Sequence, residues 1–443
     1  MTNNILDFVG IGVGPFNLGL ACLTAPIKEL NGVFLDKSEK FDWHPGMMMQ
    51  NTTLQIPFMA DLVTLADPTS PFSFLNYIKE KGRIYSFYIR ENFLLLRNEY
   101  NNYCKWAVEK LSNISFNTEV ENISYDQQKQ LYIVSCRCTK TSEIKIYKTK
   151  KIVLGTGTKP YIPKGASGLK NNAIHSSNYL FNKEQLQEKK SITILGSGQS
   201  AAEIFYDLLN YIDEKNYELN WITRSPRFFP LEYSKLTLEM TSPEYVDYFY
   251  NLPEEKRDYL INKQKHLYKG INQDLINEIH DLLYTKRIFS KEPLKVSLRT
   301  NIALINSSVD QSKISLELQQ VEENKHFIKK TEGLILCTGY HYKVPEFLND
   351  ISNRIKWDNK GRFDVKRNYT IDKNNNEIFV QNVELHTHGF VTPDLGMGSY
   401  RNSYIIKELT GKEYYPIESS IAFQQFGVTK EDEIIHNLKE QAY

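Results

Sequence analysis

The sequence lacks an excess of either charge. Its 443 residues include 54 lysines and arginines against 53 aspartates and glutamates, so the formal net charge is +1. Nucleic-acid-binding proteins usually carry a basic excess, and disordered chains are poor in apolar residues, whereas 41% of this chain is hydrophobic. The composition indicates a globular protein of more than one domain, and we expect no nucleic-acid partner.

Cysteine is scarce, and long apolar runs are missing. Of five cysteines only Cys136 and Cys138 lie close together, in a strand-like run, which argues against a disulfide framework and against a zinc site built on paired CxxC motifs. No stretch reaches 18 uninterrupted apolar residues, and the first seven residues carry no basic signal region. We therefore predict a cytoplasmic protein without a membrane span and without a metal site.

A glycine-rich turn stands near the start of the chain. The apolar run 5–11 predicts a strand, and it leads through Gly10, Gly12 and Gly14 into a helical pattern, as in a dinucleotide-binding unit. The next strand-like run ends in Asp36, 22 residues beyond Gly14, where an acid would take ribose hydroxyls. Pro15 replaces the third glycine of the fingerprint, so an ordinary tight turn is the alternative.

A second turn of the same kind follows later. The predicted strand 191–195 leads through Gly196 and Gly198 into a helix that opens with Gln199 and Ser200. The strand 219–223 ends in Arg224, and a cation there suits the 2′-phosphate of NADP, the alternative being a solvated loop arginine. Two such units imply two nucleotides.

Strand-Thr-Gly segments at 151–157 and 334–340 flank the second unit. Such segments connect the domains of flavoproteins that have two dinucleotide-binding domains, because glycine lets the backbone pass close to a cofactor. We predict an α/β fold with two Rossmann-like domains, residues 1–165 and 331–443 forming the first and residues 166–330 the second. Residues 231–290 lose the strand-helix alternation and predict a small helical subdomain over the site.

Several sequence blocks carry a family likeness. They are Gly12-Val-Gly14-Pro15-Phe16-Asn17-Leu18, Phe41-Asp42-Trp43-His44-Pro45-Gly46-Met47, Asp61-Leu62-Val63-Thr64, Phe74-Leu75-Asn76-Tyr77, Gly196-Ser-Gly198-Gln199-Ser200-Ala201, Thr338-Gly339-Tyr340 and His386-Thr-His388-Gly389. With these blocks in order over nearly its whole length, the chain resembles the N-hydroxylating flavoprotein monooxygenases of siderophore biosynthesis, which act on ornithine, lysine or a diamine.

This resemblance implies FAD, NADPH and molecular oxygen as the reactants that accompany a primary amine. A flavin C4a-hydroperoxide would transfer oxygen to the neutral amine, so the site must deliver the amine without its proton. Members of the family are commonly tetramers, so a homo-oligomer is expected.

The resemblance also assigns residues by position. FAD would be held by Gly10, Gly12, Gly14, Pro15, Asp36, Trp43, His44, Met47 and Gln55. NADPH would be held by Gly196, Gly198, Gln199, Ser200, Arg224 and Tyr340. Gln55 is also a catalytic candidate, whereas Trp43, Met47 and His44 have a purely structural alternative. His386 and His388 alternate as on a strand, but without carboxylate or cysteine companions they do not indicate a metal site.

The departures from the family concern the substrate. Amino-acid hydroxylases carry a lysine that grips the α-carboxylate where this chain has Ala60, and they tend to carry serine at Gly396. Leu267 and Tyr268 stand where ornithine enzymes present an Asn-Tyr pair. Asp394 adds an acid beside the flavin turn. We therefore interpret these five positions as substrate-binding and expect a diamine, putrescine or cadaverine, with Asp394 as a catalytic candidate that pairs with its cationic end; contact with the flavin is the alternative for Asp394.

Other functions stay open at this point. Lysine or ornithine could be the substrate if Lys235 or Lys269 replaced the missing cation, and a histamine-type amine is a further possibility. A two-dinucleotide reductase would need a CxxC-like redox pair, which the sequence lacks. A non-catalytic dinucleotide sensor would leave most of the motifs without a role.

Overall fold

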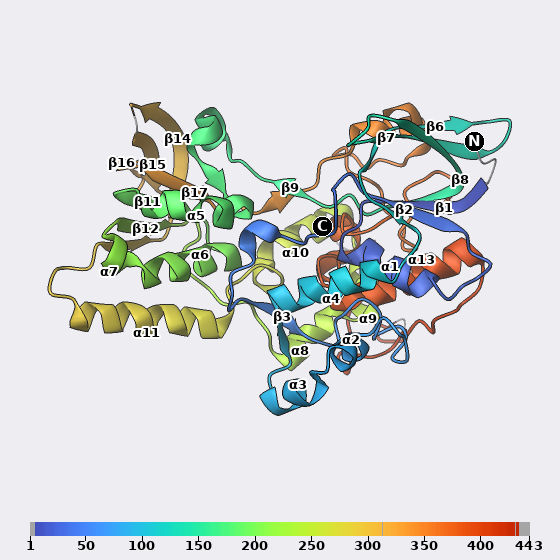
Figure 1. Ribbon diagram of the computed structural model, residues 1–443, viewed down its shortest axis with the longest axis horizontal. Coiled ribbons are helices and arrows are strands. Elements are labelled where there is room, and N and C mark those ends of the chain that lie inside the picture. The colour runs from blue at the N-terminus through green and yellow to red at the C-terminus, as the bar shows by residue number, and fades with distance from the viewer. Residues whose placement is uncertain (1–4, 312, 430, 434–443) are drawn as a thin grey trace, which may run out of the picture.

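The computed structural model describes residues 5–311, 313–429 and 431–433. Two α/β units lie side by side along the long axis of the molecule (Figure 1). Each contains a sheet with parallel strands, one of which leads through a glycine turn into a helix. The predicted α/β fold with two Rossmann-like units is confirmed.

The first unit is built on a seven-stranded sheet of order β5-β2-β1-β8-β7-β6, with β19 paired to β8. Its strands are β1 (Ile5–Ile11), β2 (Gly32–Leu35), β5 (Ile114–Ser115), β6 (Thr118–Asp126), β7 (Leu131–Cys138), β8 (Ile144–Leu154) and β19 (Ile378–Val380). β1 pairs in parallel with β2 and β8, whereas β6, β7 and β8 are antiparallel. The chain therefore returns to this sheet after the second unit is complete.

Helices cover the first sheet with apolar faces. α1 (Pro15–Thr24) is buried along most of its length, begins with a proline at its first position and packs against α13 (Gly396–Thr410). The other elements of this unit are α2 (Phe74–Glu80), α3 (Ile84–Arg90), α4 (Arg97–Glu109), β3 (Thr53–Pro57), β4 (Leu94–Leu96), η1 (Pro45–Met47), η6 (Glu346–Arg354), α12 (Leu385–His388) and η7 (Gly389–Val391). A core that includes Leu18, Leu20, Tyr100 and Ile405 holds them together.

The second unit is built on a five-stranded parallel sheet of order β10-β17-β11-β12-β13. Its strands are β10 (Ile174–His175), β11 (Ser191–Leu195), β12 (Glu218–Ile222), β13 (Val296–Arg299) and β17 (Gly333–Leu336). An antiparallel sheet of β14 (Ile302–Asp310), β15 (Lys313–Gln320) and β16 (Lys325–Thr331) accompanies it. The helices are η2 (Lys164–Asn172), η3 (Ser176–Asn178), α5 (Tyr179–Gln187), α6 (Gln199–Asn210) and α7 (Ile212–Lys215).

Two short strands connect the units. β9 (Lys159–Pro160) pairs antiparallel with β18 (Tyr340–His341), so that Tyr340 lies opposite Pro160. Figure 1 shows β9 in the segment that bridges the units. The two strand-Thr-Gly segments therefore lie together between the units.

The region 231–290 is helical, as predicted, but its parts have different partners. It contains α8 (Lys235–Leu238), η4 (Glu239–Thr241), α9 (Pro243–Asn251), α10 (Glu254–Lys263), η5 (Lys265–Leu267) and α11 (Gln273–Phe289). α9 and α10 contact α12 of the first unit, whereas α11 packs along α6 and shares the core of the second unit. Within the described part of the chain no helix is both long and apolar enough to cross a membrane.

Candidate active site

The first glycine turn forms a cradle for an anion. Gly12 has φ +86°, and a Cβ built on it would lie 2.4 Å from the Gly155 carbonyl oxygen, so only glycine fits there. A Cβ on Gly14 would meet no described atom within 4 Å, and no described side chain caps the start of α1. The amides that follow Pro15 in the first turn of α1 are therefore free to bind a phosphate, since Pro15 itself has no N–H. Pro15 occupies the first helical position, where it pre-sets the helical φ.

Asp36 joins this cradle to the end of β2. Its Oδ2 accepts a hydrogen bond from the Val13 amide at 2.7 Å, and its Oδ1 accepts one from the Ser38 amide at 2.8 Å. The carboxylate is thereby held beside the glycine turn with lone pairs left for hydroxyl donors. This geometry fits the ribose end of a dinucleotide.

The second glycine turn repeats the arrangement. Gly196 has φ +146°, and a Cβ on it would lie 2.1 Å from the Cys337 carbonyl oxygen. Gly198 precedes α6 with open space around its Cα, since a Cβ built there would have no described atom within 4 Å, and Gln199 and Ser200 form the first turn. Arg224 is exposed just beyond β12. Free helix amides and a nearby guanidinium fit a nucleotide that carries an additional phosphate.

Aromatic residues line the junction between the two units. The Trp43 and His44 rings lie 4.9 Å apart between centroids, and the His44 ring lies 6.0 Å from that of Tyr340. Met47 is buried behind them, and a Cβ on Gly46 would lie 1.9 Å from the Ser177 carbonyl oxygen, so η1 and η3 are in close contact. Residues predicted for FAD therefore face a residue predicted for NADPH.

His44 has a lowered pKa although its surface is exposed to solvent. The surrounding protein, helped by the positive charge of Arg97, lowers the pKa of His44 to about 4. Its backbone is left-handed, with φ 50° and ψ 48°. Asn, Asp and His tolerate this conformation better than branched residues do.

Gln55 lies at the same junction. Its Nε2 donates to Gln199 Oε1 at 3.4 Å, and Gln199 Oε1 also accepts from the Asn272 amide at 2.8 Å. Gln55, which was predicted to bind FAD, is thus hydrogen-bonded to Gln199, which was predicted to bind NADPH. The oxygen of the Gln55 side-chain amide, Oε1, is left to accept a further hydrogen bond.

The structure brings three predicted substrate residues together. A Cβ built on Gly396 would lie 3.5 Å from the Ala60 Cβ and 3.3 Å from Asp394 Oδ1, which accepts a hydrogen bond from the Gly396 amide at 2.8 Å. Burial raises the pKa of Asp394 above its usual range, and the Gly396 amide and the Arg401 charge act in the opposite direction. This corner combines small apolar surface with one partly buried carboxyl group.

Tyr233 is a neighbour of this corner that the sequence analysis missed. Burial and the charge of Asp394 together raise the pKa of Tyr233. A tyrosine in a loop ahead of α8 carries no local pattern that would single it out. Its place depends on the helical region folding back onto the first unit.

Leu267 and Tyr268 lie in a neighbouring aromatic cluster. Both are partly buried against Tyr245, Phe249 and Phe390, and the Tyr268 and Phe390 rings are 5.6 Å apart. Phe390 belongs to the segment that reaches Asp394 four residues later. The pair therefore supports the wall that carries Asp394.

The two lysines that could replace the missing carboxylate-binding cation, Lys235 and Lys269, lie in different surroundings. Lys269 lies over the Tyr268 ring at 5.2 Å, and burial together with Lys265 lowers its pKa. Lys235 is exposed at the start of α8. Lys269 contacts the aromatic cluster, and Lys235 faces solvent.

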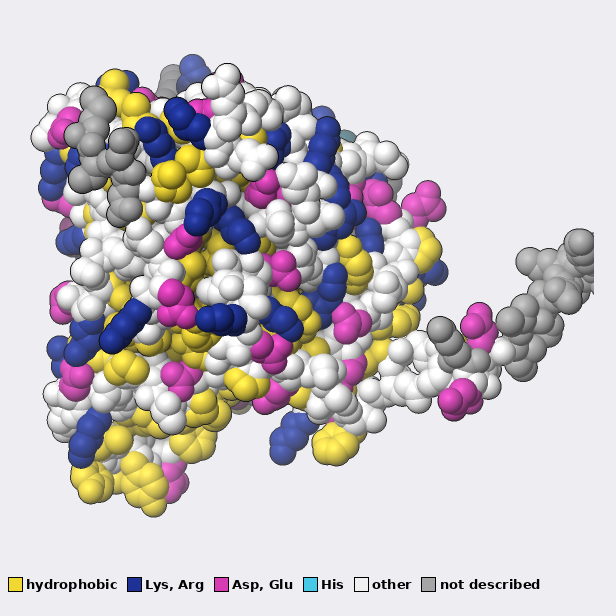
Figure 2. All heavy atoms as spheres, turned by 90° about the vertical axis from the view of Figure 1, so that its right-hand side faces the viewer, with side chains coloured by type: hydrophobic (Ala, Val, Ile, Leu, Met, Phe, Trp, Pro, Cys, Tyr) yellow, Lys and Arg dark blue, Asp and Glu magenta, His cyan; other side chains and the backbone are white. Residues whose placement is uncertain are grey.

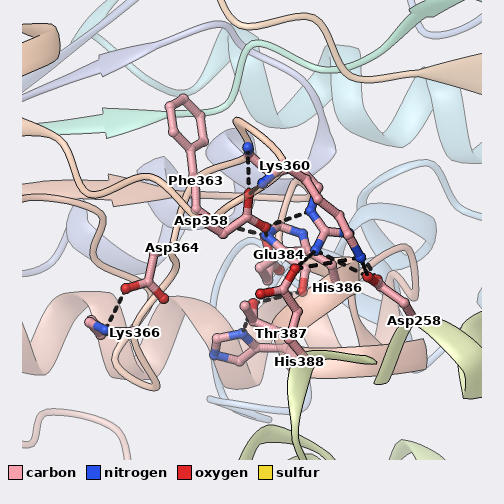
Figure 3. A network of polar contacts seen from close by, with 12 residues as sticks. Asp258, Asp358, Lys360, Phe363, Asp364, Lys366, Glu384, His386, Thr387 and His388 are labelled. Atoms are coloured by element: carbon pink, nitrogen blue, oxygen red, sulfur yellow. Dashed lines mark hydrogen bonds and ion pairs between the residues drawn. The ribbon is translucent and has the colours of Figure 1, made fainter. Parts of the chain in front are cut away.

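His386 and His388 do not alternate on a strand, as the sequence pattern indicated, but lie on α12. The His388 amide bonds to the Glu384 carbonyl, which closes a helical turn. His386 Nε2 lies 2.8 Å from the Phe363 carbonyl, and His388 Nε2 lies 3.2 Å from that of Arg367. Figure 3 shows both rings within a polar network of the protein. Among the described residues no group of three potential metal ligands occurs.

That network connects the helical region to the first unit. Arg362 Nη1 donates to Asp258 Oδ1 of α10 at 2.8 Å, and its Nε donates to Asp358 Oδ2 at 2.6 Å. Asp258 and Asp358 appear in Figure 3 on opposite sides of the cluster. Residues 358–362 of the first unit are thereby anchored to α10 of the helical region.

Known enzymes are similar to this chain over nearly its whole length. The family model described as L-lysine 6-monooxygenase/L-ornithine 5-monooxygenase matches residues 4–342. A putrescine N-hydroxylase of Acinetobacter baumannii is 49% identical over 441 residues, which cover 100% of this chain and 98% of that protein. A putrescine N-hydroxylase of Shewanella oneidensis is 50% identical over 422 residues, which cover 95% of this chain and 84% of that protein.

A solved structure has the same fold. The crystal structure of DfoA bound to FAD, a cadaverine monooxygenase of desferrioxamine biosynthesis from Erwinia amylovora, aligns with a TM-score of 0.95 and 56% identity. The alignment covers 97% of this chain and 100% of that one. From its motifs, its fold and these matches, the chain belongs to the L-lysine 6-monooxygenase/L-ornithine 5-monooxygenase family.

Proposed function

We propose that this enzyme hydroxylates one amine of a small diamine, putrescine or cadaverine, with FAD, NADPH and molecular oxygen, as a step in siderophore biosynthesis. The observation that carries the proposal is the corner formed by Ala60, Gly396 and Asp394. The relatives named for putrescine and cadaverine support the same substrate class.

Charge at this corner distinguishes a diamine from an amino acid. An α-carboxylate placed beside Asp394 would meet a like charge, and Ala60 offers nothing to neutralise it. The ammonium at the far end of a diamine would instead pair with the Asp394 carboxylate. Such pairing favours the ionised carboxylate and offsets the cost of its burial.

The chain's own residues position and shield the reaction. The amides at the starts of α1 and α6 would hold the pyrophosphates of the two cofactors, Asp36 the ribose of FAD, and Arg224 the 2′-phosphate of NADPH. When bound, these cofactors supply the hydride and the activated oxygen. Trp43 and Met47 would exclude water from the junction, and the Gln55 carbonyl oxygen would accept a hydrogen bond from the reacting amine or the flavin.

The state of the reacting amine follows from the same geometry. An alkylamine has a pKa of about 10.4 in water, so the site must favour its neutral form. His44 is neutral above a pKa of about 4 and adds no positive charge near the amine. Once the bound cofactors close the junction, Trp43, Met47 and Tyr340 would disfavour an ammonium there, while Asp394 would retain the one at the other end.

A second part of the proposal concerns assembly and location. We propose a cytoplasmic homo-oligomer, a tetramer by family resemblance. In support, α3 presents the exposed side chains Tyr85, Tyr88 and Ile89, and Figure 2 shows hydrophobic side chains gathered at its lower edge, the level of α3 in Figure 1. Elsewhere on that face basic and acidic side chains are interspersed, which gives no patch of one sign for nucleic acid.

The substrate proposal is tested with a panel of amines. NADPH oxidation and hydroxylamine formation are measured together for putrescine, cadaverine, histamine, ornithine and lysine. We expect coupled turnover with one of the two diamines. A clear preference for ornithine or lysine would instead favour Lys269 or Lys235 as a carboxylate partner.

A further inference from the structure

A buried ion pair joins the two α/β units. Arg97 Nη2 lies 2.7 Å from Glu203 Oε1, and Arg97 Nη1 lies 2.9 Å from Glu203 Oε2, so the contact is bidentate. Arg97 begins α4 of the first unit, whereas Glu203 lies in the second turn of α6 in the second unit. Their side chains are only 13% and 3% exposed.

On the first unit the pair continues to the aromatic junction. Arg97 Nη1 also donates to the Met47 carbonyl oxygen at 3.2 Å, and the Arg97 amide donates to the Thr52 carbonyl. The guanidinium therefore holds the end of η1, the element that follows Trp43 and His44.

On the second unit the pair continues to Gln199. Gln199 Nε2 donates to Glu203 Oε1 at 2.9 Å. This bond sets the orientation of the Gln199 amide, because its oxygen must then face the Asn272 amide and Gln55. Asn272 caps α11 with its side chain. The Glu203 carboxylate thus fixes, through Gln199, the hydrogen bonds that α6 makes with β3 and with the start of α11.

A buried charged pair of this kind specifies a geometry. Removing a carboxylate and a guanidinium from water costs free energy that is offset only when both partners meet with their hydrogen bonds complete. Any rotation of one unit against the other would separate the charges in a low-dielectric interface. The contact therefore favours one arrangement of the two glycine cradles.

We propose that Arg97 and Glu203 are positioning residues that fix the second unit at hydride-transfer distance from the first and act through Gln199 on Gln55. The inference rests on the proposed cofactor roles. It assigns neither residue to bond making; both act on the placement of the bound nucleotides.

The experiment compares Glu203→Gln and Arg97→Lys with the control Asp207→Asn. Asp207 lies one turn further along α6, and its ion pair with Lys183 stays within the second unit. A displacement of about 1 Å lowers the rate of a positioned reaction by roughly 100-fold. We therefore expect the limiting rate of anaerobic flavin reduction to fall by about 10- to 100-fold in Glu203→Gln and by less in Arg97→Lys, which keeps the charge. The dissociation constant of NADPH should change little, and the control should behave as wild type.

A second readout uses the FAD-free chain. Hydrogen exchange at the amides of residues 44–47 and 176–178 should accelerate in Glu203→Gln and not in Asp207→Asn. If Glu203→Gln does not fold, Arg97→Lys carries both measurements. Unchanged reduction and exchange in these variants, or equal losses in the control, would overturn the proposal. A wild-type enzyme that fails to hydroxylate any diamine would instead overturn the proposed substrate.

Discussion

The Cα of Gly396 faces the Ala60 side chain so closely that a Cβ added to it would lie 3.5 Å from the Ala60 Cβ. The same Cβ would lie 3.3 Å from Asp394 Oδ1. Two small residues on distant parts of the chain therefore leave Asp394 as the charged group of this corner. A substrate that enters the corner meets two small residues and one partly buried carboxyl group.

A lysine in place of Ala60 should impair diamine turnover. Its ammonium would reach Asp394 and compete with the substrate's distal ammonium, so we expect KM for putrescine or cadaverine to rise by about tenfold or more. Met59→Lys is the matched control, because Met59 is 47% exposed and its neighbour Ala60 only 8%. Steady-state hydroxylamine formation measures both variants, and equal KM values would refute the role of this position.

Asp394 should lower the stability of the ligand-free protein at neutral pH. Its raised pKa means that the folded state holds the proton more tightly than the unfolded chain does. The contribution of this group to the free energy of unfolding therefore declines as pH rises from about 4 through the raised pKa. Asp394→Asn should melt at a higher temperature than wild type at pH 7, with the difference vanishing at acidic pH. A variant that is less stable at pH 7 would contradict this.

His44 should cause a loss of stability in acid. Its folded-state pKa of about 4 lies below the ordinary value of 6.5, so the unfolded chain binds more protons in that interval. The stabilising contribution is present above pH 6.5 and is lost as pH falls from 6.5 to about 4. Melting temperatures of wild type and His44→Asn across this range measure the effect. Parallel pH profiles would show that His44 does not contribute.

Arg224 should determine the choice between NADPH and NADH. Loss of a charge-assisted hydrogen bond costs about 1.5–3 kcal/mol, so Arg224→Gln should raise KM for NADPH by about 10- to 100-fold. KM for NADH should stay nearly constant, since NADH lacks the 2′-phosphate. Arg227→Gln, three residues further along the same exposed loop, serves as control. If Arg224→Gln behaved like this control, Arg224 would be only a solvated arginine.

Much of the fold could be predicted because local signals coincide with it. Gly12 and Gly196 have backbone conformations and close contacts that only glycine tolerates, and Gly14 and Gly198 leave open space before the helix amides. Both glycine turns can be recognised in the sequence. The strand ends at Asp36 and Arg224 follow from the same spacing. The two strand-Thr-Gly segments were expected to connect the units, but nothing in their sequence predicted that β9 and β18 would pair with each other.

The rest depends on contacts between distant segments. Arg97 and Glu203 are 106 residues apart, and neither has a neighbour pattern that distinguishes it from a surface charge. The alternation of His386 and His388 indicated a strand, but backbone bonds to Glu384 made that segment a helical turn. The helical region was expected over the site, but the apolar side chains of α11 pack against α6 in the core of the second unit.

The pairing of Asp394 with a second ammonium is tested by comparing a diamine with a monoamine of equal length. We would measure kcat/KM for hydroxylamine formation from cadaverine and from pentylamine, in wild type and in Asp394→Asn. Truncating one partner of a buried charge pair costs about 2–5 kcal/mol, so the preference for cadaverine should fall by about 30-fold or more in the variant. An unchanged preference would contradict the claim that Asp394 holds the second ammonium of a diamine.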